Sequence, residues 1–197
     1  MTKPTFFVEE DKILASLFDE GMDYLHLHKP EAAPMYSERL LTLLPEDYYG
    51  KITVHDNFYL KDEYQLKGIH IENDSIEIPI GYKGRISRTC RNIENLKEMK
   101  KKSDYVFLRN IFDNKTDARE KATFTTEQLK DASRRGLIDK RVYALGGMNI
   151  DNIRFAKDLG FGGVVICGDL WSRFDIHNEH DYKEVIAHFE RIRKITG

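Results

Sequence analysis

Residues 143–171 read YALGGMNIDNIRFAKDLGFGGVVICGDLW and contain two short apolar runs, each followed by glycine. The first run ends at Gly146-Gly147, and the second ends at Cys167-Gly168-Asp169. The residues between them have a helical pattern that ends at Gly160, and glycine is a common helix terminator. This segment therefore predicts a strand–helix–strand unit with a glycine turn after each strand.

The same alternation of apolar strands and helical patterns runs along the whole chain. Seven strands are predicted, over Tyr24–His28, Ile52–His55, Gly68–Ile71, Gly84–Ser87, Tyr105–Leu108, Val142–Leu145 and Gly163–Cys167. Strands and helices that alternate at this spacing indicate βαβ units and a parallel sheet. We predict one domain over residues 1–197, a TIM (β/α)₈ barrel whose first strand is short or truncated, because Pro4 disfavours a strand at the N-terminus. An open doubly wound sheet is the alternative, but it predicts a phosphate loop after its first strand, and the chain has no GxGxxG motif.

Composition limits the class of partner. The net charge of −2, with 41% hydrophobic and 32% charged residues, is typical of a globular protein and argues against nucleic acid or an anionic membrane as partner. The two cysteines form no CxxC motif, which favours a reducing compartment. No apolar run reaches the roughly 18 residues that span a bilayer, and residues 1–12 lack a signal-peptide pattern. We therefore expect a cytoplasmic protein.

Polar side chains gather where the predicted strands end, which is where barrel enzymes build their active sites. In chain order these are His26, His28, Lys29, His55, Asp56, His70, Asp74, Ser87, Arg109, Lys115 and Thr116. Most of the charged groups are cationic or become so on protonation, which favours an anionic ligand.

Each of these features also has a purely structural interpretation. The two glycine turns either let backbone N–H groups approach a phosphate or only form tight turns. Asp56 either binds Mg²⁺ or caps a helix. His26 and His28 either contact ligand or pack in the barrel wall, and Cys167 lies in an apolar run that is typical of inert core.

Several motifs in one order resemble the thiamine phosphate synthase and thiazole tautomerase superfamily. They read YLHLHKP, ITVHDNF, LKGIHIE, GRISRTCRNIENL, DYVFLRNIF and YALGGMNIDNI, followed by GFGGVVICGDLW. The resemblance covers nearly the whole chain and is strongest to the short form from Bacteroidetes-type bacteria. It implies a (β/α)₈ barrel that joins hydroxymethylpyrimidine diphosphate to thiazole phosphate, releases diphosphate and uses Mg²⁺.

The resemblance also implies roles for residues at matching positions. Gly146-Gly147 and the turn at Cys167-Gly168-Asp169 would hold the thiazole phosphate, and Asp56, with Asp74 nearby, would bind the metal. Where the family has Gln-Leu-Arg-Glu-Lys, this chain has His26-Leu27-His28-Lys29-Pro30. The diphosphate contacts would therefore fall to His28, Lys29 and Ser87.

Further substrate contacts complete the expected site. They are His26, His55, His70, Arg109, Lys115 and Thr116, of which Arg109 or Lys115 would replace a missing family cation. Substitutions thus concentrate on the diphosphate and metal side of the site. Loss of a bidentate arginine matters there because histidine is only partly charged near neutral pH.

Three functions stay open at this point. The first is a thiamine phosphate synthase, the second a thiazole tautomerase-like isomerase with His28, His55 or His70 as base, and the third a non-catalytic protein that binds a phosphorylated ligand. All three predict phosphorylated small molecules as partners and exclude nucleic acid and membrane, and a homodimer is compatible with the sequence.

Overall fold

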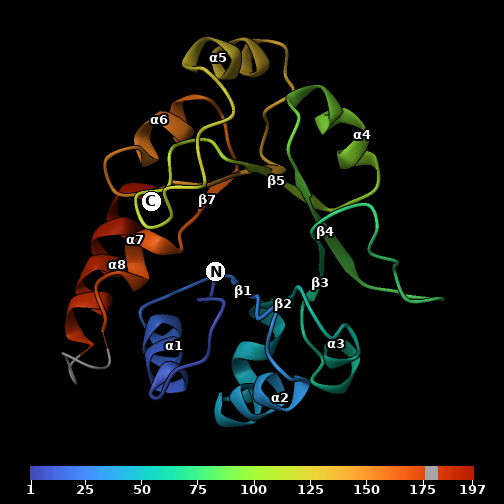
Figure 1. Ribbon diagram of the computed structural model, residues 1–197, viewed down its shortest axis with the longest axis vertical. Coiled ribbons are helices and arrows are strands. Elements are labelled where there is room, and N and C mark those ends of the chain that lie inside the picture. Colours follow the sequence, from blue (N-terminus) through green and yellow to red (C-terminus); the bar gives the residue numbers. More distant parts are fainter. Residues whose placement is uncertain (176–181) are drawn as a thin grey trace.

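The fold is a curled parallel sheet covered on its outside by helices. The computed structural model describes residues 1–175 and 182–197. Its seven strands pair in chain order, and every pair is parallel. The strands are β1 (Leu25–Leu27), β2 (Ile52–Val54), β3 (Gly68–Ile71), β4 (Arg85–Cys90), β5 (Tyr105–Arg109), β6 (Val142–Leu145) and β7 (Gly163–Val165). Figure 1 shows the strands around the centre and the helices at the periphery, so the predicted TIM-barrel-like fold is confirmed.

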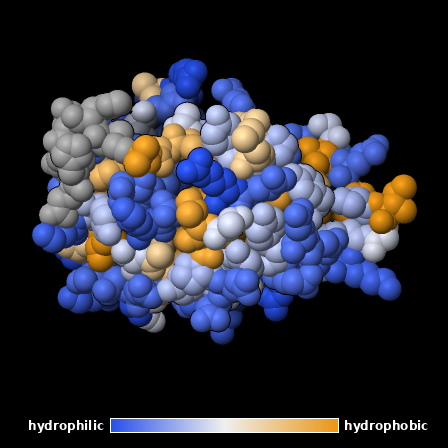
Figure 2. Space-filling model, turned by 90° about the horizontal axis from the view of Figure 1, so that it is seen from below, coloured by the Kyte–Doolittle hydropathy of each residue, from blue (hydrophilic) through white to orange (hydrophobic). Residues whose placement is uncertain are grey.

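The helices pack on the outer face of the sheet (Figure 1). They are α1 (Glu10–Asp19), α2 (Pro34–Leu43), α3 (Tyr59–Glu63), α4 (Leu96–Lys101), α5 (Thr126–Arg134), α6 (Ile153–Asp158), α7 (Gly168–Trp171) and α8 (Lys183–Thr196), with 3₁₀ turns η1 (Glu46–Lys51) and η2 (Ile93–Asn95). No helix among the described residues is long and apolar enough to cross a membrane. On the face seen in Figure 2, hydrophobic residues form separate patches within a mostly hydrophilic surface.

Alternation within the strands decides what faces the barrel interior. Leu25 and Leu27 point outward into the core that α1 and α2 share with the sheet. The side chain between them, His26, points inward, and its ring centroid lies 4.5 Å from that of Phe107 on β5, across the interior. This follows from the two-residue period of a strand, which places neighbouring side chains on opposite faces.

Residues 1–2 occupy the place between β7 and β1. The Met1 ammonium donates to the Ile166 carbonyl at 3.0 Å, and the Thr2 N–H donates to the His26 carbonyl at 3.0 Å. The Trp171 indole N–H donates to the Met1 carbonyl at 2.9 Å. A two-residue segment thus bridges the two edge strands, as the expected short first strand requires, although it is not itself a described strand.

β3 and β6 have the predicted bounds, β1, β2 and β5 differ from the prediction by one residue at one or both ends, and β4 and β7 differ more. β4 begins one residue later and continues to Cys90, because it pairs with β5 as far as Leu108. Ser87 therefore lies inside a strand and not at its end. β7 ends at Val165, before the apolar residues Ile166 and Cys167.

Candidate functional site

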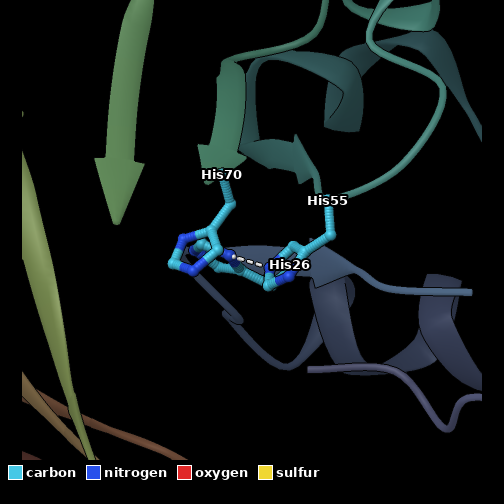
Figure 3. Close-up of side chains that lie close together, drawn as sticks. All are labelled: His26, His55 and His70. Atoms are coloured by element: carbon cyan, nitrogen blue, oxygen red, sulfur yellow. Dashed lines mark hydrogen bonds between the residues drawn. The ribbon is translucent and has the colours of Figure 1, made fainter. Parts of the chain in front are cut away.

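Four histidines meet where β1, β2 and β3 end. His26 lies on β1, His28 just after it, His55 just after β2, and His70 on β3. Figure 3 shows His26, His55 and His70 converging from these three elements. The His55 and His70 rings stack with centroids 4.1 Å apart and planes 18° apart.

A chain of hydrogen bonds runs from the barrel interior to the ends of the strands. The Tyr105 hydroxyl lies 2.8 Å from His26 Nε2, and His26 Nδ1 lies 2.7 Å from His55 Nε2. His55 Nδ1 then lies 3.1 Å from Glu72 Oε1. A carboxylate only accepts, so His55 Nδ1–H donates to Glu72, His26 Nδ1–H donates to His55, and Tyr105 donates to His26.

The buried histidines are held neutral. Burial, reinforced by the neighbouring histidine rings, keeps the pKa of His26 well below its usual value, and the same two causes act on His70. Burial also lowers the pKa of His55, and the nearby His28 ring adds to this effect. The ring nitrogens of His70 are satisfied by Ser87 Oγ at 2.8 Å and Thr89 Oγ1 at 2.9 Å. The structure therefore brings Ser87 to a histidine inside the barrel.

Asp56 lies beside His28 at the mouth of the barrel. Its Oδ2 accepts the Lys29 N–H at 2.9 Å and lies 3.4 Å from His28 Nδ1. Burial alone would raise the pKa of Asp56, but the neighbouring His28 ring and the Lys29 N–H together bring it below its usual value. Asp56 is thus a charged, partly exposed carboxylate at neutral pH.

The side chain of Lys29 does not reach this mouth. Its ammonium donates to Glu10 Oε1 at 2.6 Å, to Oε2 at 2.9 Å and to the Thr5 carbonyl at 2.9 Å. Both charged side chains are 1% exposed. The expected diphosphate contact from Lys29 does not fit this geometry, because its ammonium is already paired with the buried carboxylate of Glu10 on α1.

Sequence reasoning did not select Glu72 as a site residue, although it lies among the cations. Its Oε2 is 3.6 Å from Arg91 and 3.6 Å from Arg109, while Oε1 faces His55. Arg109 also donates to Glu120 at 2.5 Å. The structure thus brings Arg109 to the site, paired with carboxylates. The available signal was the position of Glu72, directly after β3.

Asp74 lies apart from this group. Its side chain is 77% exposed and its Oδ1 is 3.6 Å from Arg88. Among the described residues, two groups of three have ligand atoms close enough for one metal ion, and neither includes Asp56 or Asp74. The expected pairing of these two aspartates on one metal is therefore not seen.

The glycine turns pack against the loop that follows β5. Gly146 and Gly147 have φ values of +104° and +62°, which favour glycine. A Cβ on Gly146 would lie 2.8 Å from the Asn110 backbone, and one on Gly147 would collide with the Asp113 carbonyl. A Cβ on Gly168 would collide with the hydroxyl of Thr116. Both turns therefore need glycine, because the loop after β5 packs directly against their backbone.

The side chains of the second turn bond to other parts of the protein. Asp169 Oδ2 lies 2.6 Å from His188 Nε2 on α8. The Cys167 thiol donates to the Thr2 carbonyl at 3.4 Å, and burial raises its pKa. Only the backbone of this turn is left to contact an anion.

A cleft of about 600 Å³ opens between the loop after β5 and the start of α6. Lys115 and Gly147 both line it, together with Asn149 and Asn152. None of the barrel histidines does. The predicted site residues therefore divide into a histidine group near β1–β3 and a glycine–lysine group near β6.

Comparisons with known proteins identify the family of the chain. A family model described as thiamine monophosphate synthase matches residues 10–170. The chain belongs to the thiamine monophosphate synthase family. No curated protein shows significant similarity to it.

Two solved structures are similar to the chain over most of its length. Thiamine phosphate pyrophosphorylase from Bacteroides thetaiotaomicron is 47% identical, with a TM-score of 0.89 over 98% of this chain and 94% of its own. Thiamine phosphate pyrophosphorylase from Pyrococcus furiosus is 20% identical, with a TM-score of 0.70 over 95% of this chain and 89% of its own. The second likeness shows the fold of the thiamine monophosphate synthase family, and the first extends over nearly the whole sequence.

Proposed function

We propose that this protein is a thiamine phosphate synthase, a transferase that joins hydroxymethylpyrimidine diphosphate to thiazole phosphate. The observation that carries the proposal is the 47% identity, over nearly the whole chain, to a thiamine phosphate pyrophosphorylase. The proposed unit is a single domain over residues 1–197, and the proposed location is the cytoplasm.

The reaction needs a site that stabilises a leaving diphosphate. The C–O bond between the pyrimidine methylene and the diphosphate breaks, and diphosphate leaves with the electron pair. The thiazole nitrogen then forms a bond to the methylene carbon. Positive groups near the leaving group lower this barrier. Arg91 and Arg109, beside Glu72, supply such groups at the mouth of the barrel.

Asp56 fits a role in holding Mg²⁺. It is charged and partly exposed, and only its Oδ2 is engaged among the described residues. Mg²⁺ in phosphate-transfer sites is commonly held by one or two carboxylates together with substrate phosphates. Bound there, Mg²⁺ would neutralise charge on the departing diphosphate. Asp74 is outside this proposal because it is exposed and paired with Arg88.

The thiazole phosphate is assigned to the glycine turns after β6 and β7. Support comes from their backbone geometry and from Lys115, a cation that lines the same cleft as Gly147. The loop after β5, which packs on both turns, would lie beside the bound phosphate and limit the access of water.

Two substitutions that each remove one negative charge test the proposal. Asp56→Asn should lower the rate of thiamine phosphate formation by roughly 100-fold or more, since it removes charge at the leaving group. Asp74→Asn, the matched control, should stay within about twofold of wild type because Asp74 is exposed and its ion pair with Arg88 lies near the surface. Full activity of the Asp56 variant would remove this residue from the mechanism.

A second function is favoured by one contact. His28 Nδ1 lies 3.4 Å from Asp56 Oδ2 and the His28 side chain is partly exposed, an arrangement suited to a general base in a thiazole isomerase. Incubation with the thiazole carboxylate phosphate alone separates the two. Isomerisation without pyrimidine diphosphate would support the isomerase, and its absence, with product from the paired substrates, would support the synthase.

A further inference from the structure

We propose that His28, His55 and Glu72 form a binding site for a divalent transition-metal ion of the Zn²⁺ or Co²⁺ type at the mouth of the barrel. Each residue offers one donor atom, and the three atoms lie within 4.8 Å of one another. A tetrahedral ion with bonds of about 2.0–2.2 Å needs donors roughly 3.3 Å apart. The separation of 3.1 Å between His55 Nδ1 and Glu72 Oε1 already meets this requirement.

The donor set selects the class of ion. Two imidazoles and one carboxylate suit Zn²⁺, Co²⁺, Fe²⁺ or Mn²⁺. Mg²⁺ prefers oxygen ligands alone. This site therefore differs in chemistry from the magnesium position proposed at Asp56, although Asp56 Oδ2 lies only 3.4 Å from His28 Nδ1. Asp56 is the nearest further carboxylate that a bound ion would meet.

One ring nitrogen of His28 makes no hydrogen bond in the described part of the metal-free protein, although it lies 3.4 Å from Asp56 Oδ2. Its Nδ1 is buried and has no hydrogen-bond partner among the described residues. Its backbone is held on both sides by Thr2, whose hydroxyl accepts the His28 N–H at 3.0 Å and donates to the His28 carbonyl at 3.1 Å. The side chain keeps 21% of its surface exposed, so the ring lies next to solvent although Nδ1 itself is buried.

Outer contacts fix the orientation of the other two ligands. Arg91 and Arg109 lie at Oε2 of Glu72, which leaves Oε1 turned toward His55. Such outer partners are typical of metal sites, where they orient the ligands and raise affinity. The arginines also balance the carboxylate charge, so the site favours an ion that arrives together with an anion.

The histidine chain accommodates metal at His55 without a change in proton number. Without metal, Tyr105 donates to His26, which donates to His55, which donates to Glu72. With metal on Nδ1, the proton of His55 moves to Nε2 and donates to His26 Nδ1. His26 then donates from Nε2 to the Tyr105 oxygen, and each ring keeps one proton.

The fully buried group His26, His55 and His70 is the less suitable position. Its donor atoms are also within 4.8 Å of one another, and Figure 3 shows the rings close together. However, both nitrogens of His70 already bond Ser87 and Thr89, and both nitrogens of His26 bond His55 and Tyr105. An ion there would break these contacts, whereas the outer group includes His28, whose Nδ1 has no hydrogen-bond partner among the described residues.

The test is metal binding to the full chain after treatment with chelator. Co²⁺ is titrated at neutral pH and followed by its visible absorption, and Zn²⁺ and Mg²⁺ are titrated by calorimetry. Wild type should bind one equivalent of Co²⁺ or Zn²⁺ with imidazole-type absorption, and Mg²⁺ at least about tenfold more weakly. Glu72→Gln and His28→Gln should each weaken Co²⁺ binding by about tenfold or more.

Asp74→Asn is the control, because it removes the same charge two residues from Glu72 but no proposed ligand. It should bind Co²⁺ like wild type. Circular dichroism of each variant shows whether the chain is folded. The proposal is overturned if wild type binds no stoichiometric Co²⁺, if neither ligand substitution weakens binding, or if Asp74→Asn weakens it equally. These readouts need no turnover, so failure of the metal site and failure of the synthase assignment are separate results.

Discussion

Replacement of Lys29 by methionine tests whether this lysine stabilises the fold or binds substrate. Its ammonium lies 2.6 Å and 2.9 Å from the two oxygens of Glu10, and both side chains are 1% exposed. The same ammonium lies 4.2 Å from the ring centroid of Phe6. Lys29→Met leaves the Glu10 carboxylate buried without its cation.

The expected loss of stability is large. Breaking a buried ion pair from one side costs about 3–5 kcal/mol. In a chain of 197 residues this corresponds to a fall in Tm of roughly 6–20 °C. The double variant Glu10→Leu/Lys29→Met should lose less than half as much, because an apolar pair of similar volume replaces two buried charges.

Acidification should reduce the deficit of the single variant. Burial already raises the pKa of Glu10, partly offset by Lys29, and loss of Lys29 raises it further. An acid whose pKa is raised on folding binds protons more readily in the folded state, so the variant gains stability relative to wild type as pH falls from 7 toward about 4.3.

Urea unfolding of wild type, single and double variants at pH 7 and pH 5 measures both effects, with activity assayed under folded conditions. A Lys29→Met protein within about 1 kcal/mol of wild type that has nevertheless lost activity would refute this reasoning. That result would instead support a role for Lys29 in binding diphosphate.

Three further predictions concern the turns and the buried histidines. Gly147→Ala should destabilise the protein by about 1 kcal/mol more than Gly136→Ala, because both have similar positive φ (+62° and +67°) but only the first Cβ meets the Asp113 carbonyl; equal losses in urea unfolding would contradict the packing of the loop. Tyr105→Phe should cost about 1–3 kcal/mol, since it removes the hydroxyl that satisfies His26; an unchanged midpoint would contradict the hydrogen-bond chain. Because burial depresses the pKa of the three barrel histidines, the unfolded chain takes up more protons below about pH 6.5. In chelator, the unfolding free energy should therefore fall from pH 7 to 5.5 by up to about 1.4 kcal/mol per pH unit per histidine, and a flat profile would oppose it.

The parallel architecture was predictable because the strand pattern is local. Apolar runs separated by helical patterns define βαβ units without knowledge of any contact. The inward direction of His26 also follows from its place between Leu25 and Leu27. The end of β4 was not predictable, because its last residue is set by pairing with β5, a property of a neighbouring strand.

The positions of the candidate side chains at the strand ends were predictable, but their orientations were not. Strand ends located the histidines and Asp56, because the carboxyl ends of parallel strands meet at one edge. The direction of Lys29 depends on Glu10, which lies 19 residues away and reaches it only through folding. Glu72 rather than Asp74 faces the histidines, and this depends in the same way on arginines that come later in the chain. Spacing along the chain carries no signal for such partners.

The most direct test of the central claim is product formation from the two proposed substrates. Purified protein is mixed with hydroxymethylpyrimidine diphosphate, thiazole phosphate and Mg²⁺, and thiamine phosphate and diphosphate are quantified. Thiamine phosphate and diphosphate should form in equal amounts. Neither should form when either substrate is omitted. Binding of both substrates without formation of either product would contradict this claim.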